Sequence, residues 1–571
     1  MKQILYLETI FRCAFLLAAV LSASLLHAGD LYKNDRKRWI GYVKELTPDL
    51  KHKLVRPIAI VRAVKDPSAF QSWRFEKIGL PEDICNTDFQ KLQSVVLDFG
   101  KHYTGFFSFS TKIIKGVMHS PIRLKFHFAE LPAELNTPLD PWKGGLARSW
   151  MQDEIITVTE PNIIMTIPRR MSFRYVKIEV VGECMWFEYA LDNIQVNAQT
   201  SAGEIKTSLG KDCPKIISDI RNVGIETLKE CMQEVYEDGP KRDRRLWLGD
   251  MYLENLANRH SFKNFALTKR CLYLFASTAE KDGFVNPCCF ELPVPHSQQS
   301  RCVPYSLLFI SVLYDYLADT QDYRTANDLW RVAKRQMELV LESVGPDGVY
   351  EAPKNAWIFF DWRKDFDYNT SMQALCAISL DKIAELAKKL DRESEIEGWN
   401  GIAEKMRAAA KEKLYSPERR VFISGKNKQI SVLSQAWATL AGFADDETCR
   451  IAIAEALESG DSVKVGTPYA MHYVIEAMIK CGMKAEARRL LESYWGGMVK
   501  KGADTFWEVY DPNDDYISPY GFFPLNSACH AWSCTPVYFI ALRQRLWNGR
   551  KKRGQREGKM FYNAQCVNQG L

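Results

Sequence analysis

The spacing of apolar residues changes once along this 571-residue chain, and that change limits what the chain can fold into. From about residue 31 to residue 198, short runs alternate apolar and polar residues with period two, and Gly, Pro, Asn and Asp separate them. From residue 214 to about residue 545, apolar residues recur at helical spacing. A polar stretch at residues 200–213 lies between the two blocks. Because strands and helices in separate blocks form separate packing units, we expect a multidomain protein with an all-β domain before an all-α domain.

The first block predicts an antiparallel β-sandwich over residues 29–205. Its strand-like runs are Pro57–Val64, Ser94–Gly100, Thr104–Phe109, Ile122–Phe128, Glu154–Val158, Asn162–Ile167 and Arg174–Val181. Many short strands in one block favour a jelly-roll-like arrangement. Modules of this kind bind sugars or simply pack against a catalytic domain, and the strand pattern leaves both alternatives open.

The second block predicts an all-α domain over residues 206–545. Eleven helices are expected, at residues 214–234, 251–279, 303–319, 324–344, 371–390, 395–414, 429–443, 446–458, 468–482, 484–496 and 526–544. No fixed repeat period joins them, which disfavours a regular solenoid. Consecutive helices with short and long loops in alternation fit a helical bundle or a ring of helical hairpins.

Both ends of the chain have the composition of segments that lie outside folded domains. Lys2 and Arg12 precede an apolar run that ends at Leu26, and the small Ala28 follows, so residues 1–28 predict a secretory signal peptide. The run is short for a membrane span, and an uncleaved anchor is the alternative. We therefore expect an exported protein, periplasmic or extracellular, with no stable membrane association after cleavage. Residues 546–571 are basic and polar, which favours a solvated tail over one that binds a membrane or a polyanion.

The composition argues against several classes of function. A net charge of +6 is small for this length and indicates no nucleic-acid partner. The fifteen Cys are scattered, and most lie on apolar helix faces, which favours buried free thiols over disulfides. The Cys and His residues show no spacing typical of a metal site, so we expect no metal and no cofactor.

Two stretches of the second block concentrate carboxylates beside aromatic residues. Residues 238–250 contain three Asp, four Lys or Arg and a Trp, and Pro240 prevents a regular helix there. Residues 502–511 place Glu508 between two predicted helices. Glycoside hydrolysis needs two carboxyl groups across a cleft, one protonated for the leaving oxygen and one ionised to activate water. Carboxylates beside arginines are also typical of surface ion pairs, so the residues alone leave both interpretations open.

Three motifs, taken in order, resemble those of the α-L-rhamnosidases of glycoside hydrolase family 78. The first is similar to Asp-Cys-Pro-(Gln)-Arg-(Asp)-Glu-x-x-Gly-Trp-x-Gly-Asp, matched here by Asp238, Pro240, Arg242, Trp247, Gly249 and Asp250. The second is similar to Gly-Ala-Thr-Thr-x-Trp-Glu, matched by Gly502, Ala503, Thr505, Trp507 and Glu508. The third is similar to Ser-x-x-His-x-Trp-Ser-x-x-Pro, matched within residues 527–536. Asp361-Trp362 resembles the family's Gly-Asp-Trp, and the resemblance covers most of the mature chain.

The resemblance implies an (α/α)6 barrel with the active site in its mouth. It also implies inverting hydrolysis of a terminal α-L-rhamnosyl residue from a poly- or oligosaccharide. By position, Asp243 takes the general-acid place and Glu508 the general-base place. The sugar-contacting places fall on Asp238, Trp247, Asp250, Asp361, Trp362 and His530. Four of these have a structural alternative. Trp247 and Trp362 could be plain core aromatics, Asp361 could cap the following helix, and His530 could be a core histidine on a predicted helix.

The chain also departs from the family pattern. Asp243 stands where the family usually has Glu, so its side chain is one methylene shorter. Gly239 replaces Cys, Leu246 replaces Gly, and little sequence follows the last predicted helix, where the family usually has a C-terminal β-domain. These departures leave two alternatives open. One is the same scaffold acting on another sugar such as a uronic acid, and the other is a carbohydrate-binding protein without catalysis.

The chemistry sets different conditions on the two carboxyl groups. As general acid, Asp243 needs a raised pKa, which Trp247 and nearby carboxylates would favour and arginines turned toward it would oppose. As general base, Glu508 should stay ionised, and we expect it to have the wetter surroundings of the two.

Overall fold

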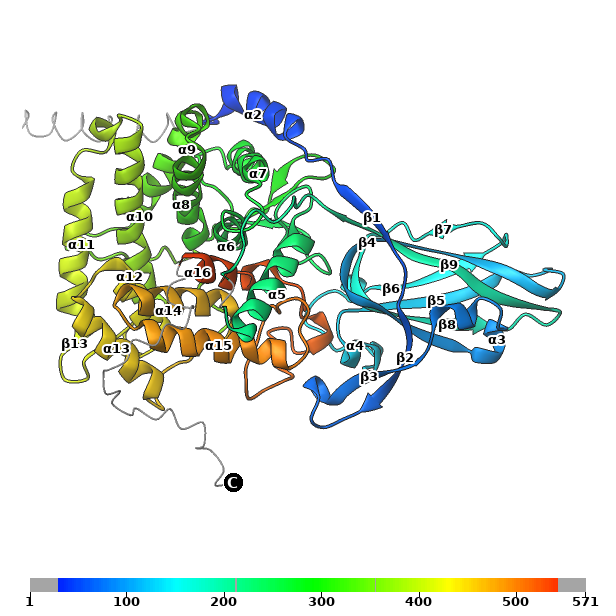
Figure 1. The fold of residues 1–571 in the computed structure, drawn as a ribbon. Helices are drawn as coiled ribbons and strands as arrows, with labels where there is room; N and C mark the ends of the chain where they lie inside the picture. The colour runs from blue at the N-terminus through cyan, green and yellow to red at the C-terminus, as the bar shows by residue number, and fades with distance from the viewer. Residues whose placement is uncertain (1–28, 211–212, 355, 543–571) are drawn as a thin grey trace, which may run out of the picture.

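The computed structural model describes residues 29–210, 213–354 and 356–542, and Figure 1 shows them as two parts side by side. The N-terminal part is an antiparallel sheet domain and the C-terminal part is helical, as the change in periodicity predicts. The predicted signal peptide and basic tail lie outside the described residues. In the part of the chain that the structure describes, no helix is long and apolar enough to cross a membrane.

The sheet domain is built from strands that pair only in the antiparallel sense. They are β1 (Lys51–Val55), β2 (Ala59–Lys65), β3 (Trp73–Gly79), β4 (Ser94–Gly116), β5 (Ile122–Ala129), β6 (Asp153–Val158), β7 (Met165–Thr166), β8 (Met171–Gly182) and β9 (Phe187–Thr200). The main order is β1–β9–β4–β8–β5–β6, with β2 and β7 also paired to β4, and β3 to β2. The long strand β4 serves two layers, because its residues up to Gly105 pair with β8 and those from Gly105 onward pair with β9.

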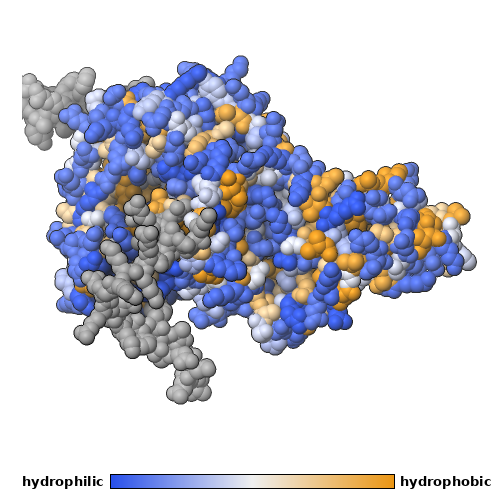
Figure 2. All heavy atoms as spheres, viewed as in Figure 1, coloured by the Kyte–Doolittle hydropathy of each residue, from blue (hydrophilic) through white to orange (hydrophobic). Residues whose placement is uncertain are grey.

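The two layers of the sheet domain enclose an aromatic core. Phe99, Phe107, Phe128 and Phe173 are all buried, and their rings pack edge to face at centroid distances of 4.9 to 6.3 Å. This geometry suits the ring quadrupole and fixes how the layers stack. Figure 2 shows that apolar residues also gather on the surface of the sheet domain, at the end away from the helices.

The structure merges and adds elements relative to the predicted strands. The runs 94–100 and 104–109 form the single strand β4, because an irregularity between Asp98 and Tyr103 lets the strand continue. The run 162–167 contributes only β7. Strands β1, β3 and β9 were not predicted, nor was helix α2 (Lys33–Glu45), which packs against the helical part through a hydrogen bond from Trp39 Nε1 to Asp328 Oδ2 of 3.1 Å.

The helical part holds twelve α-helices within the described residues. They are α5 (Lys215–Cys231), α6 (Leu248–Asn258), α7 (Phe265–Thr278), α8 (Val303–Thr320), α9 (Tyr323–Leu341), α10 (Asn369–Lys389), α11 (Trp399–Lys413), α12 (Val432–Ala441), α13 (Asp446–Glu458), α14 (Pro468–Lys480), α15 (Lys484–Lys500) and α16 (Pro536–Leu542). Helices α6, α8, α10, α12 and α14 contact one another in turn, and α16 contacts α6. The other helices cover this inner ring from outside (Figure 1). The arrangement is the ring of helical hairpins that the sequence allowed.

Two of the predicted helices were wrong in extent. The predicted helix 251–279 is divided into α6 and α7. Asn264 caps the start of α7, because its Oδ1 accepts a hydrogen bond from Leu267 N, while the backbone N–H of Asn264 donates to Asn258 Oδ1 at the end of α6. The predicted helix 526–544 is irregular up to residue 535, and α16 begins only at Pro536. His530 therefore lies on a loop with extended backbone, not on a helix.

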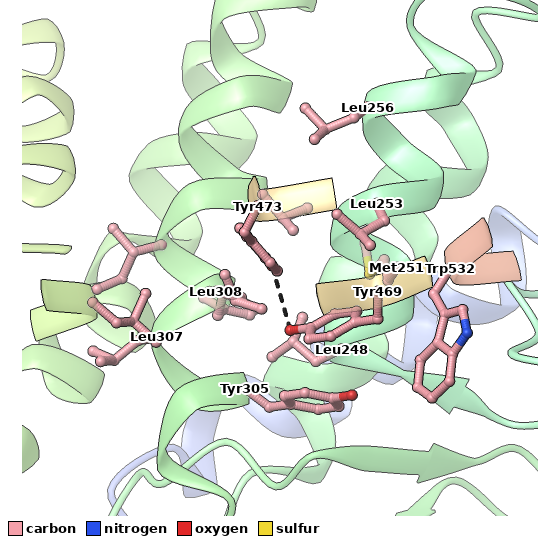
Figure 3. Packing of buried hydrophobic residues seen from close by; sticks show 14 of the residues in the cluster. Leu248, Met251, Leu253, Leu256, Tyr305, Leu307, Leu308, Tyr469, Tyr473 and Trp532 are labelled. Atoms are coloured by element: carbon pink, nitrogen blue, oxygen red, sulfur yellow. Dashed lines mark hydrogen bonds between the residues drawn. The ribbon is translucent and has the colours of Figure 1, made fainter. Parts of the chain in front are cut away.

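The helices of the inner ring are buried on most sides, because other helices surround them. Figure 3 shows Leu253 of α6, Leu308 of α8 and Tyr473 of α14 among the packed residues of this core. The Tyr473 hydroxyl donates a 3.3 Å hydrogen bond to the Tyr469 hydroxyl. At one end of this core the packing gives way to Tyr305, Tyr469 and Trp532, and Tyr305 and Trp532 line the cavity described next.

Candidate active site

A cavity of about 330 Å³ opens where the ring of helices faces the sheet domain, a volume that suits a small ligand. Its lining consists of Leu146, Trp150, Asp238, Arg242, Asp243, Arg245, Trp247, Asp250, Gln298, Tyr305, Trp357, Phe359, Trp362, Glu508, Tyr520, His530 and Trp532. The structure thus brings together Asp238, Asp243, Trp247, Asp250, Trp362, Glu508 and His530 from four separate stretches of sequence. Of the predicted site residues, Asp361 alone is outside the lining.

The loop at residues 238–250 is closed by its own backbone and side chains. Asp238 N donates to Arg245 O at 3.1 Å, and Arg245 N donates to Asp238 Oδ1 at 3.0 Å. Between them, Asp243 and Arg244 have φ values of 61° and 55°, in the left-handed region. That conformation costs roughly 1 to 2 kcal/mol for each non-glycine residue, so the surrounding contacts must enforce it. The result is a sharp turn at the residue predicted to be the general acid.

The Glu508 carboxylate is held by three donors. Arg242 Nη2 donates to Oε2 at 2.7 Å and Ser527 N donates to Oε2 at 3.0 Å, while the Tyr520 hydroxyl donates to Oε1. Burial alone would raise the pKa of Glu508, but Arg242, His530 and the donated hydrogen bonds together lower that pKa below its usual value. Glu508 is therefore ionised at neutral pH, as predicted.

The Asp243 carboxylate lies on the more open side of the cavity. Its side chain is 16% exposed, against 2% for Glu508, so the expectation of wetter surroundings for Glu508 was wrong. Glu508 stays ionised through its three donors and not through water. Arg242 Nη1 is 3.4 Å and Arg245 Nη1 is 3.7 Å from the Asp243 carboxylate, whereas Arg244 reaches back to the Lys241 carbonyl. One guanidinium, that of Arg242, thus contacts both predicted catalytic carboxylates.

Asp250 and His530 present unsatisfied polar atoms on the cavity lining. Asp250 Oδ1 and His530 Nδ1 are 3.6 Å apart, and neither has a hydrogen-bond partner although both are buried. Burial raises the pKa of Asp250 well above its usual value and lowers the pKa of His530 to about 4. Buried polar atoms without partners are rare and costly, so this pair is suited to a hydroxyl group that a ligand would supply.

Asp238 is the third buried carboxyl group of the site. Burial raises the pKa of Asp238 well above its usual value, and the neighbouring Asp243 and Asp250 act in the same direction. A neutral carboxyl group can donate one hydrogen bond and accept another. Asp238 and Asp250 therefore offer both kinds of contact to a polyhydroxylated ligand.

Aromatic rings form much of the remaining wall. Trp247 meets Trp357 edge to face at 6.0 Å, and Phe359 meets Trp362 at 5.1 Å. Trp362 is 36% exposed, so its ring stands at the cavity edge. Rings of this kind present apolar surface to the C–H faces of a sugar.

Asp361, which was predicted to contact a sugar, lies outside the cavity lining and makes hydrogen bonds to the start of α14. Its carboxylate accepts hydrogen bonds from Gly466 N at 2.7 Å and from Thr467 Oγ1 at 2.8 Å. Thr467 is the N-cap of α14, so Asp361 ties the segment before Trp362 to the start of that helix. Both carboxylate oxygens of Asp361 therefore have partners within the protein.

Several lining residues were missed by the sequence analysis. Arg242 and Trp532 belong to the recognised motifs, but nothing in the motifs says which way their side chains point. Tyr520 lies in an irregular segment without a motif. Leu146 and Trp150 come from the sheet domain, between β5 and β6, and only the folded structure shows that this connection reaches the site.

Within the described residues, no group of three or more His, Cys, Asp or Glu side chains is placed to hold a metal ion. The thirteen described Cys are free thiols, and eleven of them are buried.

Comparisons with known proteins match both parts of the chain. The family model for the N-terminal domain of glycosyl hydrolase family 78 alpha-rhamnosidases matches residues 57–198, and that for the bacterial alpha-L-rhamnosidase six-hairpin glycosidase domain matches residues 202–542. A rhamnosidase from Klebsiella oxytoca with rhamnose bound is 35% identical with a TM-score of 0.85, over 89% of this chain and 98% of that one. A family 78 rhamnosidase of Bacillus sp. GL1 is 20% identical with a TM-score of 0.68, over 82% of this chain and 50% of that one. No curated protein matches the chain.

Proposed function

Because this chain belongs to the family 78 α-L-rhamnosidases and is a glycoside hydrolase, we propose that it removes a terminal α-L-rhamnosyl residue with inversion at the anomeric carbon. The observation that carries the proposal is the pair of carboxyl groups, Asp243 and Glu508, on one cavity of sugar size. In this proposal Asp243 gives its proton to the leaving oxygen, and Glu508 takes a proton from the attacking water.

The arrangement of Arg242 supports the inverting mechanism. Its guanidinium lies between the two carboxylates and contacts each through a different nitrogen, which keeps them from direct contact. Inverting glycosidases need room for a water molecule, with carboxyl groups about 6.5 to 9.5 Å apart, against about 5 to 5.5 Å in retaining enzymes. The same guanidinium keeps Glu508 ionised, as a general base requires.

The cavity lining favours a neutral deoxy sugar over a uronic acid. Arg242 and Arg245 are the cationic side chains of the described lining, and both already contact the catalytic carboxylates. A uronate carboxylate would meet no free cation there, and an unpaired buried charge is costly. The aromatic wall instead suits the C–H faces and the methyl group of a 6-deoxy hexose, and the Klebsiella rhamnosidase with rhamnose bound supports this choice.

Hydrolysis of an aryl α-L-rhamnoside by the purified protein tests the proposal. We expect Asp243→Asn and Glu508→Gln each to lower kcat by about 10² to 10⁴, the usual contribution of a general acid or base. The parent should release β-L-rhamnose first, observed by NMR before the anomers equilibrate. Parent rates in both variants would exclude these roles, and initial release of the α-anomer would exclude inversion. A parent that binds L-rhamnose in calorimetry but hydrolyses no rhamnoside would be a binding protein.

We also propose that residues 1–28 direct export to the periplasm or the extracellular space. Expression of the full chain followed by N-terminal sequencing of the exported protein tests this. A mature protein beginning near residue 29 is expected. Activity that stays entirely with the cytoplasmic fraction as uncleaved chain would contradict it.

A further inference from the structure

A buried lysine joins the sheet domain to the catalytic loops. The Lys241 ammonium is 2.8 Å from Glu134 Oε2, 3.2 Å from Glu130 Oε2 and 2.8 Å from the Asn526 carbonyl oxygen, to which it donates. An ammonium group has three N–H donors, and these three acceptors use all of them. The side chains of Lys241, Glu130 and Glu134 are each at most 2% exposed, so the ion pairs are closed to solvent.

The three partners of Lys241 come from different parts of the chain. Glu130 and Glu134 belong to the connection after β5, in the sheet domain, and Glu134 lies in the short helix α4 (Pro132–Leu135). Lys241 itself directly precedes Arg242 and Asp243. Asn526 lies in the segment that returns from the cavity wall toward α16.

The two proposed catalytic carboxylates are each linked to this junction through a neighbouring residue. On one side, Lys241 is followed by the residue that contacts Asp243 and Glu508 together. On the other side, Ser527 N donates to Glu508 Oε2 at 3.0 Å, and Ala528 N donates to Glu130 Oε2 at 2.6 Å. The carboxylate of Glu130 is therefore contacted from both sides. Lys241 comes from the loop that contains Asp243, and Ala528 comes from the segment that contacts Glu508.

The residue type at position 241 makes the junction ionic. A buried lysine is tolerated when acidic partners compensate its charge, and removing one member of such a pair leaves an uncompensated buried charge. In the family motif that this loop resembles, the corresponding place holds Gln, which is neutral. Lys241 and the glutamates of the sheet domain thus form a matched set in this chain.

We propose that Lys241 is a positioning residue for hydrolysis, which fixes the spacing of Asp243 and Glu508 by anchoring both loops to Glu130 and Glu134 of the sheet domain. This rests on the proposed catalytic roles of those two carboxylates. A displacement of about 1 Å between catalytic groups can cost about 10² in rate. The sheet domain then takes part in catalysis through geometry, without touching the reacting atoms.

The test compares Lys241→Met, Lys241→Arg and the double variant Lys241→Met/Glu134→Gln with the parent on an aryl α-L-rhamnoside, well below each melting temperature. Lys215→Met is the matched control, since the Lys215 side chain on α5 is 88% exposed. We expect Lys241→Met to lower kcat by about 10- to 100-fold with KM changed less than threefold. Lys241→Arg should recover part of kcat, because it keeps the charge. The double variant should recover part of the lost Tm, because Glu134→Gln removes one unpaired carboxylate. Its kcat should stay as low as that of Lys241→Met.

Three results would each overturn the inference. The first is that Lys241→Met, measured below its Tm, has the same kcat as the parent. The second is that the double variant recovers both Tm and kcat, which is what a merely structural role of Lys241 would give. Hydrogen–deuterium exchange separates this test from the proposed function. Faster exchange in residues 238–245 and 526–530 of the double variant is expected whether or not the parent hydrolyses rhamnosides, and unchanged exchange in both segments also overturns the inference. A parent without rhamnosidase activity overturns only the proposed function.

Discussion

At the scale of single residues, Arg242 explains how two carboxyl groups in one cavity can have different roles. It donates to Glu508 at 2.7 Å and lies 3.4 Å from Asp243. The guanidinium also lies over the ring of Tyr520, which helps to fix its orientation. The pKa of Arg242 is raised by the carboxylates around it although burial alone would lower it, so the group stays charged. Its stronger contact is with Glu508, which is the group that must remain ionised.

Removing Arg242 should move the acid limb of the pH–rate profile. Glu508 has a lowered pKa, so its base form is present above that pKa and is lost as the pH falls through it. Without the guanidinium the pKa of Glu508 rises. As the pH is lowered, activity should therefore begin to fall at a higher pH than in the parent. For Arg242→Met we expect the acid limb of kcat/KM to move up by about 1 to 3 pH units, measured on an aryl α-L-rhamnoside from pH 3 to 9.

Tyr520→Phe is the matched control for the Arg242 variant. It removes the hydrogen bond to Glu508 Oε1 and keeps the ring, so it should move the same limb in the same direction by a smaller amount. An unchanged acid limb in Arg242→Met would mean that Glu508 is not the group that controls it.

The residue types of the site were predictable from the sequence, whereas their directions were not. Two carboxylate-rich stretches and a resemblance identified Asp243 and Glu508, and the structure places both on the cavity. The same reasoning placed Asp361 in the site because it precedes Trp362, but its carboxylate bonds to α14 instead. Side-chain direction depends on neighbours that are distant in the sequence, such as Gly466 for Asp361, and local patterns do not contain that information.

At the scale of secondary-structure elements, the connection between β5 and β6 matters most for the site. It carries α4 and the short 3-10 helix η4 (Arg148–Trp150), and it packs Leu139 and Met151 against Leu525 of the helical part. Periodicity predicted the strands on either side, but it gave no sign that an irregular connection would form a cavity wall. Loops have no repeating pattern, so their contacts become visible only in the fold.

Trp150 of η4 should contribute to substrate affinity. Its ring lines the cavity and lies 5.5 Å from the guanidinium of Arg245, which in turn faces Asp243. This is the more exposed side of the site, where the proposed general acid Asp243 would meet the leaving group. We expect Trp150→Ala to raise KM for a rhamnosyl oligosaccharide about tenfold, equivalent to ~1.4 kcal/mol, with kcat changed little.

Trp150→Phe keeps an aromatic surface and serves as the control for the truncated side chain. Its KM should stay within about threefold of the parent, and both variants should keep the parent Tm to within a few degrees. A tenfold loss of kcat at unchanged KM in Trp150→Ala would instead assign the residue to the organisation of Asp243 through Arg245.

At the scale of the whole molecule, the sheet domain and the ring of helices share buried polar contacts. His102 of β4 illustrates this, since its ring Nε2 is 3.1 Å from Glu130 Oε1 and its backbone N donates to Asp504 Oδ2 of the helical part at 2.9 Å. Thr104 N, two residues on, donates to Glu230 Oε2 on α5. Contacts of this kind predict that the two parts unfold together and not one after the other.

The stability of this shared junction should depend on pH through His102. Burial alone would lower the pKa of His102, but Cys529, Glu130 and Glu230 raise it to about 10. A histidine in the unfolded chain has a pKa of about 6.5. The stabilisation by protonated His102 is thus fully present below about pH 6.5 and is lost as the pH rises through 10, at up to ~1.4 kcal/mol per pH unit.

Thermal unfolding measured from pH 6 to pH 10 tests this dependence, with His102→Gln as the comparison. Glutamine keeps a polar group near Glu130 and Ser172 but cannot gain a proton. The parent should therefore lose Tm toward pH 10 more steeply than the variant, because only the parent releases a proton from this site. The two curves should also be single transitions, since the junction joins both parts of the molecule. Parallel curves for the parent and the variant would show that His102 stays neutral in the folded state over this pH range, and that its protonation does not contribute to the stability of the junction.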